Sequence, residues 1–214
     1  LVCLVGSEMC IRDSPEADLP LAIKSGGNKL IWDMRYPGYK EFEGMVFYSS
    51  PNKGPKAIPG EYLISLNYNG EVIEQSLKIE KDPRLENTDK DYRDQFDFLI
   101  NVRNQVTRAN SAIIKIREVQ KDLNYLKQKS GLTEEINNLI NQFEIKLSHI
   151  ENNIHMTKNQ SRQDPLNYGI RINNRIAFLL ADSQRGDYPP TNQAKAFFKE
   201  ITAELDREME ALEK

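Results

Sequence analysis

The chain has 214 residues, a length that suits one or two small domains. Charged residues make up 29% of it and the formal net charge is −3, a balance that suits a soluble protein and argues against a nucleic-acid-binding surface. No run approaches the roughly 20 apolar residues that a membrane-spanning helix needs, so the sequence predicts no membrane span.

The opening stretch, LVCLVGSEMCIRDS, shares no pattern with the rest of the chain and holds both cysteines, Cys3 and Cys10. The apolar run at its start is too short for the core of a signal peptide, and no third cysteine completes a metal site. Written back as codons, Leu4 to Asp13 reads CTC GTG GGC TCG GAG ATG TGT ATA AGA GAC, which matches a transposase-type adapter used in sequencing libraries. We interpret residues 1–14 as adapter-derived; the alternative is an ordinary disordered N-terminal tail.

On this interpretation the natural chain begins near Pro15, and it begins inside a longer protein, as in a metagenomic fragment. The natural part then has no cysteine and no visible targeting signal, and neither absence specifies a cellular compartment. Resequencing of the locus across the junction at Ser14–Pro15 would show whether the opening belongs to the gene and what precedes it.

Composition changes sharply at the stretch Lys81-Asp82-Pro83-Arg84. Before it, Pro and Gly turns separate aromatic and β-branched runs. After it, Gly and Pro nearly vanish over long stretches and apolar residues recur at every third or fourth position. We therefore expect an α+β protein of two domains, with a β domain at 15–82, a linker at 83–87 and a helical domain at 88–214.

The clearest β element is a hairpin centred on Asn69-Gly70, because both residues tolerate the positive φ angles of a type I′ turn. Alternating apolar residues precede the turn over 62–68, and the return strand runs over about 71–79. We expect further strands at 28–35 and 45–49. Short strands with Pro and Gly turns predict an antiparallel Ig-like β-sandwich, truncated because a complete one needs about seven strands, with one edge left unpaired.

The helical domain contains four amphipathic patterns. The first runs over 88–129 with apolar residues close to heptad spacing, and Gly131 is suited to a left-handed cap. Thr133 caps a second helix, a third covers about 170–183, and Thr191 caps the fourth. Short connections predict an antiparallel four-helix bundle with one long helical hairpin.

Four acidic residues of the β domain lie near aromatic side chains: Asp33, Glu41, Glu43 and Glu61. Glycosidases use a carboxylate pair that flanks a sugar, and aromatic side chains bind sugars. The simpler interpretation is that Trp32 is a core residue and that Asp33 and Arg35 pair or hydrogen-bond a loop. The sequence thus predicts no catalytic, cofactor-binding or metal-binding residue.

Two polar features of the helical domain have similarly plain interpretations. His149 and His155 are six residues apart, so they do not share a helix face as a metal-binding pair at i, i+4 would, and we expect both to be solvated. The segment 161–168 is polar and turn-forming, and it leads to Asn173 and Asn174. We interpret it as a hydrogen-bonded loop between helices; the alternative is a docking surface for the rest of a larger chain.

Five blocks carry a resemblance to a known family. The first three are GGNKLIWDMRYPG, IPGEYLISLNYNGE and KIEKDPR. They resemble the Ig-like segment near the C-terminus of large bacterial proteins with sortilin-like, Asp-box (BNR-repeat) β-propellers. The other two, SRQDPLNYGIRINNRIAFL and GDYPPTNQAKAFF, resemble the helical end of the same proteins. The order of the blocks matches over nearly all of Pro15 to Lys214.

The resemblance implies a protein that is exported to the periplasm, the cell surface or the medium. Such proteins are often labelled glycosyl hydrolases on the strength of the propeller. Because the propeller is absent from this sequence, no catalytic residue of the family carries over to it.

The sequence therefore favours a non-catalytic accessory fragment that braces the propeller or mediates protein–protein contact. Its expected partner is its own missing N-terminal β-propeller, with another protein or a glycan as a further partner. The alternative is a part of a glycosyl hydrolase or peptidase-like hydrolase whose catalytic residues lie in the propeller, with the Trp32–Tyr39 loop completing the cleft. A third hypothesis, favoured by the long seam of the first helix, is a free-standing helical partner protein.

Overall fold

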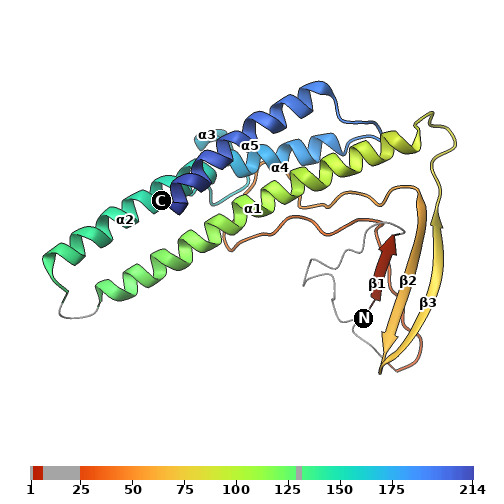
Figure 1. Ribbon diagram of the computed structural model, residues 1–214, viewed down its shortest axis with the longest axis horizontal. Coiled ribbons are helices and arrows are strands. Elements are labelled where there is room, and N and C mark those ends of the chain that lie inside the picture. The colour runs from red at the N-terminus through yellow and green to blue at the C-terminus, as the bar shows by residue number, and fades with distance from the viewer. Residues whose placement is uncertain (1, 7–24, 129–131) are drawn as a thin grey trace. The chain divides into compact units, whose positions relative to one another are not determined.

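The computed structural model describes residues 2–6, 25–128 and 132–214, and in them three strands and five helices (Figure 1). An antiparallel sheet and separate helices make the fold α+β, which confirms the predicted class. The chain divides into two compact units. Among the described residues, the β unit contains 2–6, 25–37, 55–96 and 187–189, and the helical unit contains 38–54, 97–128, 132–186 and 190–214.

The β unit is built on a three-stranded antiparallel sheet in the order β1 (Val2–Gly6), β2 (Gly60–Tyr68), β3 (Glu71–Ile79). The predicted hairpin is confirmed: Asn69 and Gly70 have φ angles of 50° and 89°, as a type I′ turn requires. Strand β1, from the opening interpreted as adapter-derived, pairs with β2. The rest of that opening lies outside the described residues, and its origin stays a prediction.

The strands predicted at 28–35 and 45–49 are wrong, because neither segment forms one. Each contains a residue other than glycine in the left-handed region, Met34 with a φ of 57° and Ser49 with a φ of 50°. A side chain at positive φ cannot continue an extended strand, so the chain turns at both positions. Local backbone geometry has overridden the β-type composition of these segments.

An aromatic cluster packs inside the β unit. The indole of Trp32 is half-buried, 6.0 Å from the ring of Tyr62, and its Nε1 donates a hydrogen bond to the carbonyl oxygen of Arg35 at 3.1 Å. The ring of Tyr36 meets that of Phe96 edge to face at 4.7 Å. Trp32 is therefore held by a loop and a strand of this unit.

The four longer helices agree with the predicted patterns. They are α1 (Asp89–Lys127), α2 (Glu134–Ile154), α4 (Ile172–Ser183) and α5 (Asn192–Glu213), and the one-turn helix α3 (Pro165–Tyr168) stands where a turn was expected. The predicted caps are confirmed, because the hydroxyl of Thr133 accepts from the amide of Ile136 and that of Thr191 accepts from the amide of Ala194. Gly131 lies outside the described residues.

The core of the helical unit lies between α1, α2, α4 and α5. The stripe predicted on the first helix is confirmed, since its central members are fully buried: Val102, Val106, Ala109, Ile113 and Ile116. The facing helices contribute Ile150, Ile154, Ile176, Leu180, Ile201 and Leu205. Full burial of such a side chain contributes about 1.5–3 kcal/mol, so this seam stabilises the unit.

Helices α1 and α2 run antiparallel as a hairpin (Figure 1). Helix α5 packs against α2 and α4, and it ends alongside α2 before the hairpin reaches its turn. The outer part of the hairpin therefore consists of two helices only, and its apolar side chains are more exposed than those of the core.

Residues 38–54, which we name the strap, belong to the helical unit although the sequence placed them in the β domain. The strap has no regular strand and bonds to helices instead. The amide of Lys40 donates to the hydroxyl of Thr107 at 3.2 Å, and the amide of Tyr48 donates to Oδ1 of Asn174 at 2.8 Å. Its backbone groups are thus satisfied by helix side chains rather than by a neighbouring strand.

Candidate functional site

A chain of buried polar side chains crosses the core of the helical unit. Asn110 of α1, His155 at the end of α2 and Asn173 of α4 are each at most 2% exposed. The amide nitrogen of Asn173 donates to Oδ1 of Asn110 at 3.1 Å and to Nδ1 of His155 at 3.2 Å. Asn110 in turn donates to the carbonyl oxygen of Lys40 in the strap at 2.6 Å. This network joins three helices to the strap.

The expectation that His155 is solvated is wrong. His155 is the C-cap of α2 and has extended backbone angles, φ −134° and ψ 140°, so helical periodicity no longer determines where its ring points. The ring lies 4.9 Å from that of Phe42, edge to face. Burial first, and then the positive charge of Arg117, lower the pKa of His155 to about 4, so the ring is neutral at pH 7.

Arg117 of α1 links the same region to the strap. Its Nε lies 2.8 Å from Oε1 of Glu151 in α2, and its Nη1 donates to the carbonyl oxygen of Glu43 at 2.9 Å. Its guanidinium also lies over the ring of Phe42, 4.8 Å from the centroid. One side chain thus holds a helix partner and a strap residue together by an ion pair, a hydrogen bond and a cation–π contact.

The other end of the strap is fastened by Asn174. Its amide nitrogen donates to the carbonyl oxygen of Tyr48 at 3.2 Å and to the hydroxyl of Ser50 at 3.1 Å. The hydroxyl of Tyr39 donates to the carbonyl oxygen of Ser50 at 2.8 Å, and burial raises the pKa of Tyr39, so this hydroxyl stays protonated. The side chains of Tyr39, Ser50 and Asn174 are buried, and these hydrogen bonds give their polar groups partners inside the unit. Their hydrogen bonds anchor the strap to α4.

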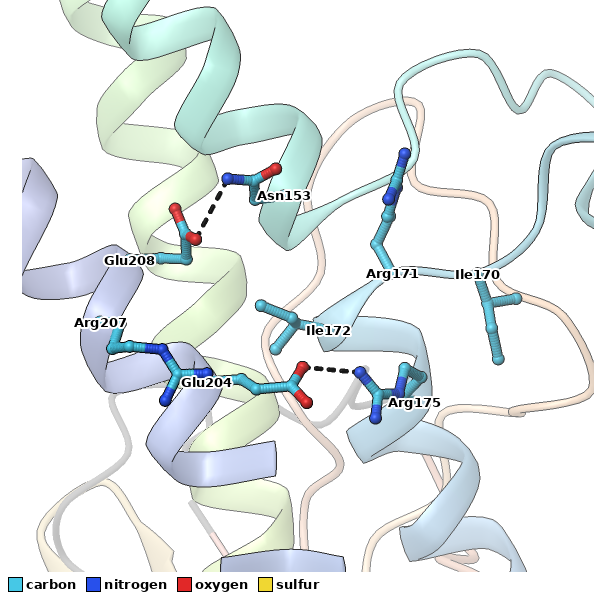
Figure 2. Close-up of a pocket in the computed structure, with 8 residues that line it drawn as sticks. All are labelled: Asn153, Ile170, Arg171, Ile172, Arg175, Glu204, Arg207 and Glu208. Carbon is cyan, nitrogen blue, oxygen red and sulfur yellow. Dashed lines mark hydrogen bonds and ion pairs between the residues drawn. The ribbon is translucent and has the colours of Figure 1, made fainter. Parts of the chain in front are cut away.

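A polar cleft opens on a different part of the helical unit, where α2, the start of α4 and α5 meet (Figure 2). Its volume is about 320 Å³. The lining residues are Asn153, Ile170, Arg171, Ile172, Arg175, Glu204, Arg207 and Glu208. Two contacts cross it: Nη1 of Arg175 pairs with Oε2 of Glu204 at 2.6 Å, and the amide of Asn153 donates to Glu208 at 3.1 Å. This cleft is the candidate binding site.

The four acidic residues weighed as a carboxylate pair are all exposed: Asp33, Glu41, Glu43 and Glu61. Oδ1 of Asp33 accepts a hydrogen bond from the amide of Arg35 at 3.0 Å, which confirms the interpretation that these two residues stabilise a loop. His149 is exposed, as expected, and its Nδ1 lies 3.3 Å from the amide nitrogen of Asn153.

The interpretation of 161–168 as a hydrogen-bonded loop between helices is confirmed. Oδ2 of Asp164 accepts from the amides of Gln160 and Ser161, at 2.7 Å each. These bonds hold the pKa of Asp164 below its usual value and close the turn that precedes α3. The alternative of a docking surface here stays a prediction.

Sequence analysis missed the residues of the cleft. Glu204 and Glu208 are four apart within α5, and that spacing places them on one helix face, whereas Arg171, four residues before Arg175, is the N-cap of α4 with extended backbone angles. The spacing was readable, but charged pairs of this kind are common on solvated helix faces. Only the packing of α4 against α5 brings the two pairs together.

Among the residues that the structure describes, no three or more His, Cys, Asp or Glu side chains are grouped so that they could hold a metal ion. Within the same residues, no helix has the length and apolar character needed to cross a membrane. Comparison of this chain with protein-family models, with curated proteins and with solved structures gives no match.

Proposed function

We propose that this chain is a non-catalytic accessory part of a larger exported bacterial protein and that its helical hairpin makes a protein–protein contact. The proposed partner is the β-propeller that precedes the Ig-like segment in the family that the sequence blocks resemble. The proposals of export and of a propeller partner rest on that resemblance alone. The proposal of a protein–protein contact rests on the surface of the hairpin.

The observation that carries the proposal is a row of exposed apolar side chains on the outer part of the α1–α2 hairpin. We name it the hairpin surface, and its members are Val119, Leu126, Ile136, Leu139 and Phe143, between 36% and 55% exposed. On α2 the row continues a buried stripe, since Phe143 lies three residues after Ile140 and four before Leu147.

Three polar contacts join the two helices beside this surface: Lys127 pairs with Glu144, Gln120 donates to Ser148, and Arg117 pairs with Glu151. The apolar row stays at least one-third exposed after the hairpin has formed. Large exposed apolar groups on a soluble helix mark a surface that another protein covers.

The β unit presents an apolar face of the same kind. Leu66 and Ile73 are cross-strand partners on β2 and β3, and they are 40% and 64% exposed. Tyr68, on the same face of β2, is 54% exposed. In an Ig-like sandwich such a face is covered by a second sheet, so we propose that upstream strands supply it. For the helical unit we propose an antiparallel four-helix bundle of α1, α2, α4 and α5.

A binding experiment tests the proposed contact. The region of the source gene upstream of Pro15 is sequenced, its propeller is produced separately, and its binding to this chain is measured by calorimetry. We expect saturable binding that the double substitution Leu139→Glu, Phe143→Glu weakens at least about tenfold, because two charges would have to be buried in an apolar contact.

Ile145→Glu is the matched control. Ile145 is 71% exposed but lies two residues from Phe143, on the opposite face of α2, so this substitution should leave binding unchanged. No binding of the propeller, or equal losses in the two variants, would contradict the proposal. Turnover of a glycoside by the chain alone would overturn its non-catalytic character.

A further inference from the structure

The polar cleft of the helical unit carries an excess of positive charge. Three arginines and two glutamates line it. Both glutamates already have partners, since Arg175 pairs with Glu204 and the amide of Asn153 donates to Glu208. Arg175 is further held over the ring of Phe197, 5.5 Å from its centroid. These contacts fix the carboxylates and one guanidinium as the wall of the cleft.

The two remaining guanidinium groups are not used by the fold. Neither Arg171 nor Arg207 makes an ion pair or a side-chain hydrogen bond with another residue in the described part of the chain, and both are exposed. Arg207 of α5 and Arg171 at the start of α4 lie on two sides of Ile172 (Figure 2). The charge that the cleft offers to a ligand is therefore positive at two separated points.

The start of α4 adds to this charge. The helix begins at Ile172, in the lining of the cleft, and its N-cap residue Arg171 provides no side-chain cap. The positive end of the helix dipole thus lies in the cleft with arginine rather than an acid at its cap position. Ile170 and Ile172 supply the apolar part of the lining, which suits the carbon skeleton of a ligand.

We propose that this cleft binds a small organic dianion, in which two carboxylate or sulfate groups contact Arg171 and Arg207 and the skeleton between them lies on Ile172. Guanidinium groups recognise both kinds of anion through paired N–H donors. A volume of about 320 Å³ is at the lower end of small-molecule sites, which fits a ligand of a few carbons between its charges. This binding is independent of the hairpin surface, whose residues lie elsewhere on α1 and α2.

A titration followed by nuclear magnetic resonance tests the proposal, with succinate, glutarate and adipate as probes and acetate and glucose as controls. We expect saturable shifts of the amides of Arg171, Ile172 and Arg207 with at least one dicarboxylate. Acetate should bind about tenfold more weakly because it engages one guanidinium, and glucose should cause no shift. Added sodium chloride should weaken the binding of the dicarboxylate, because both arginines are exposed and salt screens their charges.

Substitutions complete the test. Arg171→Gln and Arg207→Gln should each weaken the affinity for the tightest-binding dicarboxylate by about tenfold, because each removes one charged hydrogen-bonding group. Arg162→Gln is the matched control, because Arg162 is an exposed arginine of the same unit outside the cleft. Unchanged melting temperatures would show that the variants are folded. The proposal is overturned if no dicarboxylate shifts these amides, or if the protein that carries both Arg171→Gln and Arg207→Gln responds as the unsubstituted protein does.

Discussion

The amide nitrogen of Asn173 donates a hydrogen bond to Nδ1 of His155 at 3.2 Å, and neither side chain is more than 2% exposed. The imidazole is therefore an acceptor at Nδ1, which only its neutral form can be. Protonation inside the core would place a charge in a buried site near Arg117, and burial and that second charge are what lower the pKa of His155. The stability of the helical unit is thus tied to the neutral state of one histidine.

Stability should fall as the pH is lowered from about 6.5 to about 4. The pKa of His155 is about 4 in the folded protein and near 6.5 in the unfolded chain, so in this window the unfolded chain binds more protons. The stabilisation is complete above pH 6.5 and is lost as the pH falls through the folded value, a loss of about 3 kcal/mol. Urea unfolding at a series of pH values measures it.

His155→Gln should flatten this pH dependence, because glutamine keeps a hydrogen-bonding side chain but does not titrate. Exposed His149 provides the control, and His149→Gln should leave the slope unchanged. An equally steep slope in the His155→Gln protein would show that other groups cause the acid sensitivity.

Gly38→Ala should destabilise the helical unit by about 1–3 kcal/mol, the usual cost of overpacking. A Cβ atom at Gly38 would lie 2.0 Å from Oδ1 of Asn52. That amide cannot simply move away, because it accepts from the amide of Tyr39 and donates to its carbonyl oxygen, at 2.8 Å each. Chemical denaturation gives the difference in the free energy of unfolding.

Gly27→Ala is the control for that measurement, since a Cβ at Gly27 would meet nothing within 4 Å. Adding Asn52→Ala to Gly38→Ala should remove the clash. The free energy of unfolding of the double variant should therefore fall by less than the sum of the decreases in the two single variants. Strict additivity would show that the two side chains do not interfere.

Asn174→Ala should free one end of the strap and cost about 1–3 kcal/mol, because a buried amide that bonds the backbone of Tyr48 on both sides is lost. Faster hydrogen exchange at the amide of Tyr48, and faster proteolysis within 38–54, should accompany the loss. Asn138→Ala, at an exposed position of α2, should change neither rate. Unchanged protection of Tyr48 in the Asn174→Ala protein would show that the strap is held by other contacts.

Periodic elements of this chain were predictable because their signals are local. Apolar spacing located the four long helices, and the β-hairpin and two helix caps followed from single residue types at Asn69-Gly70, Thr133 and Thr191. Each of these signals acts within a few residues of itself, so no knowledge of the rest of the fold is needed.

The strap, the buried histidine and the cleft were not predictable in the same way. Strap residues are aromatic and β-branched enough to suggest a strand, but helix side chains far along the sequence take their hydrogen bonds, as Asn174 does for Tyr48. His155 leaves the helical conformation at a cap, where periodicity ends. The cleft exists only because three elements meet, so the spacing of its charged residues along the chain does not by itself indicate a binding site.

A matched pair of substitutions tests whether the hairpin surface is open in solution. Phe143 is 55% exposed, whereas Ile140, one turn earlier on the same stripe, is 6% exposed. Phe143→Gln should change the free energy of unfolding by no more than about 0.5 kcal/mol, as expected of an exposed position, and should reduce binding of an apolar dye. Ile140→Ala should lower the free energy of unfolding by about 2–5 kcal/mol, because it leaves a cavity beneath the hairpin.

A decrease in the free energy of unfolding of the Phe143→Gln protein as large as that of Ile140→Ala would mean that Phe143 is covered in the isolated chain. The surface would then be closed by a second copy of the chain, and sedimentation at several concentrations would detect that dimer.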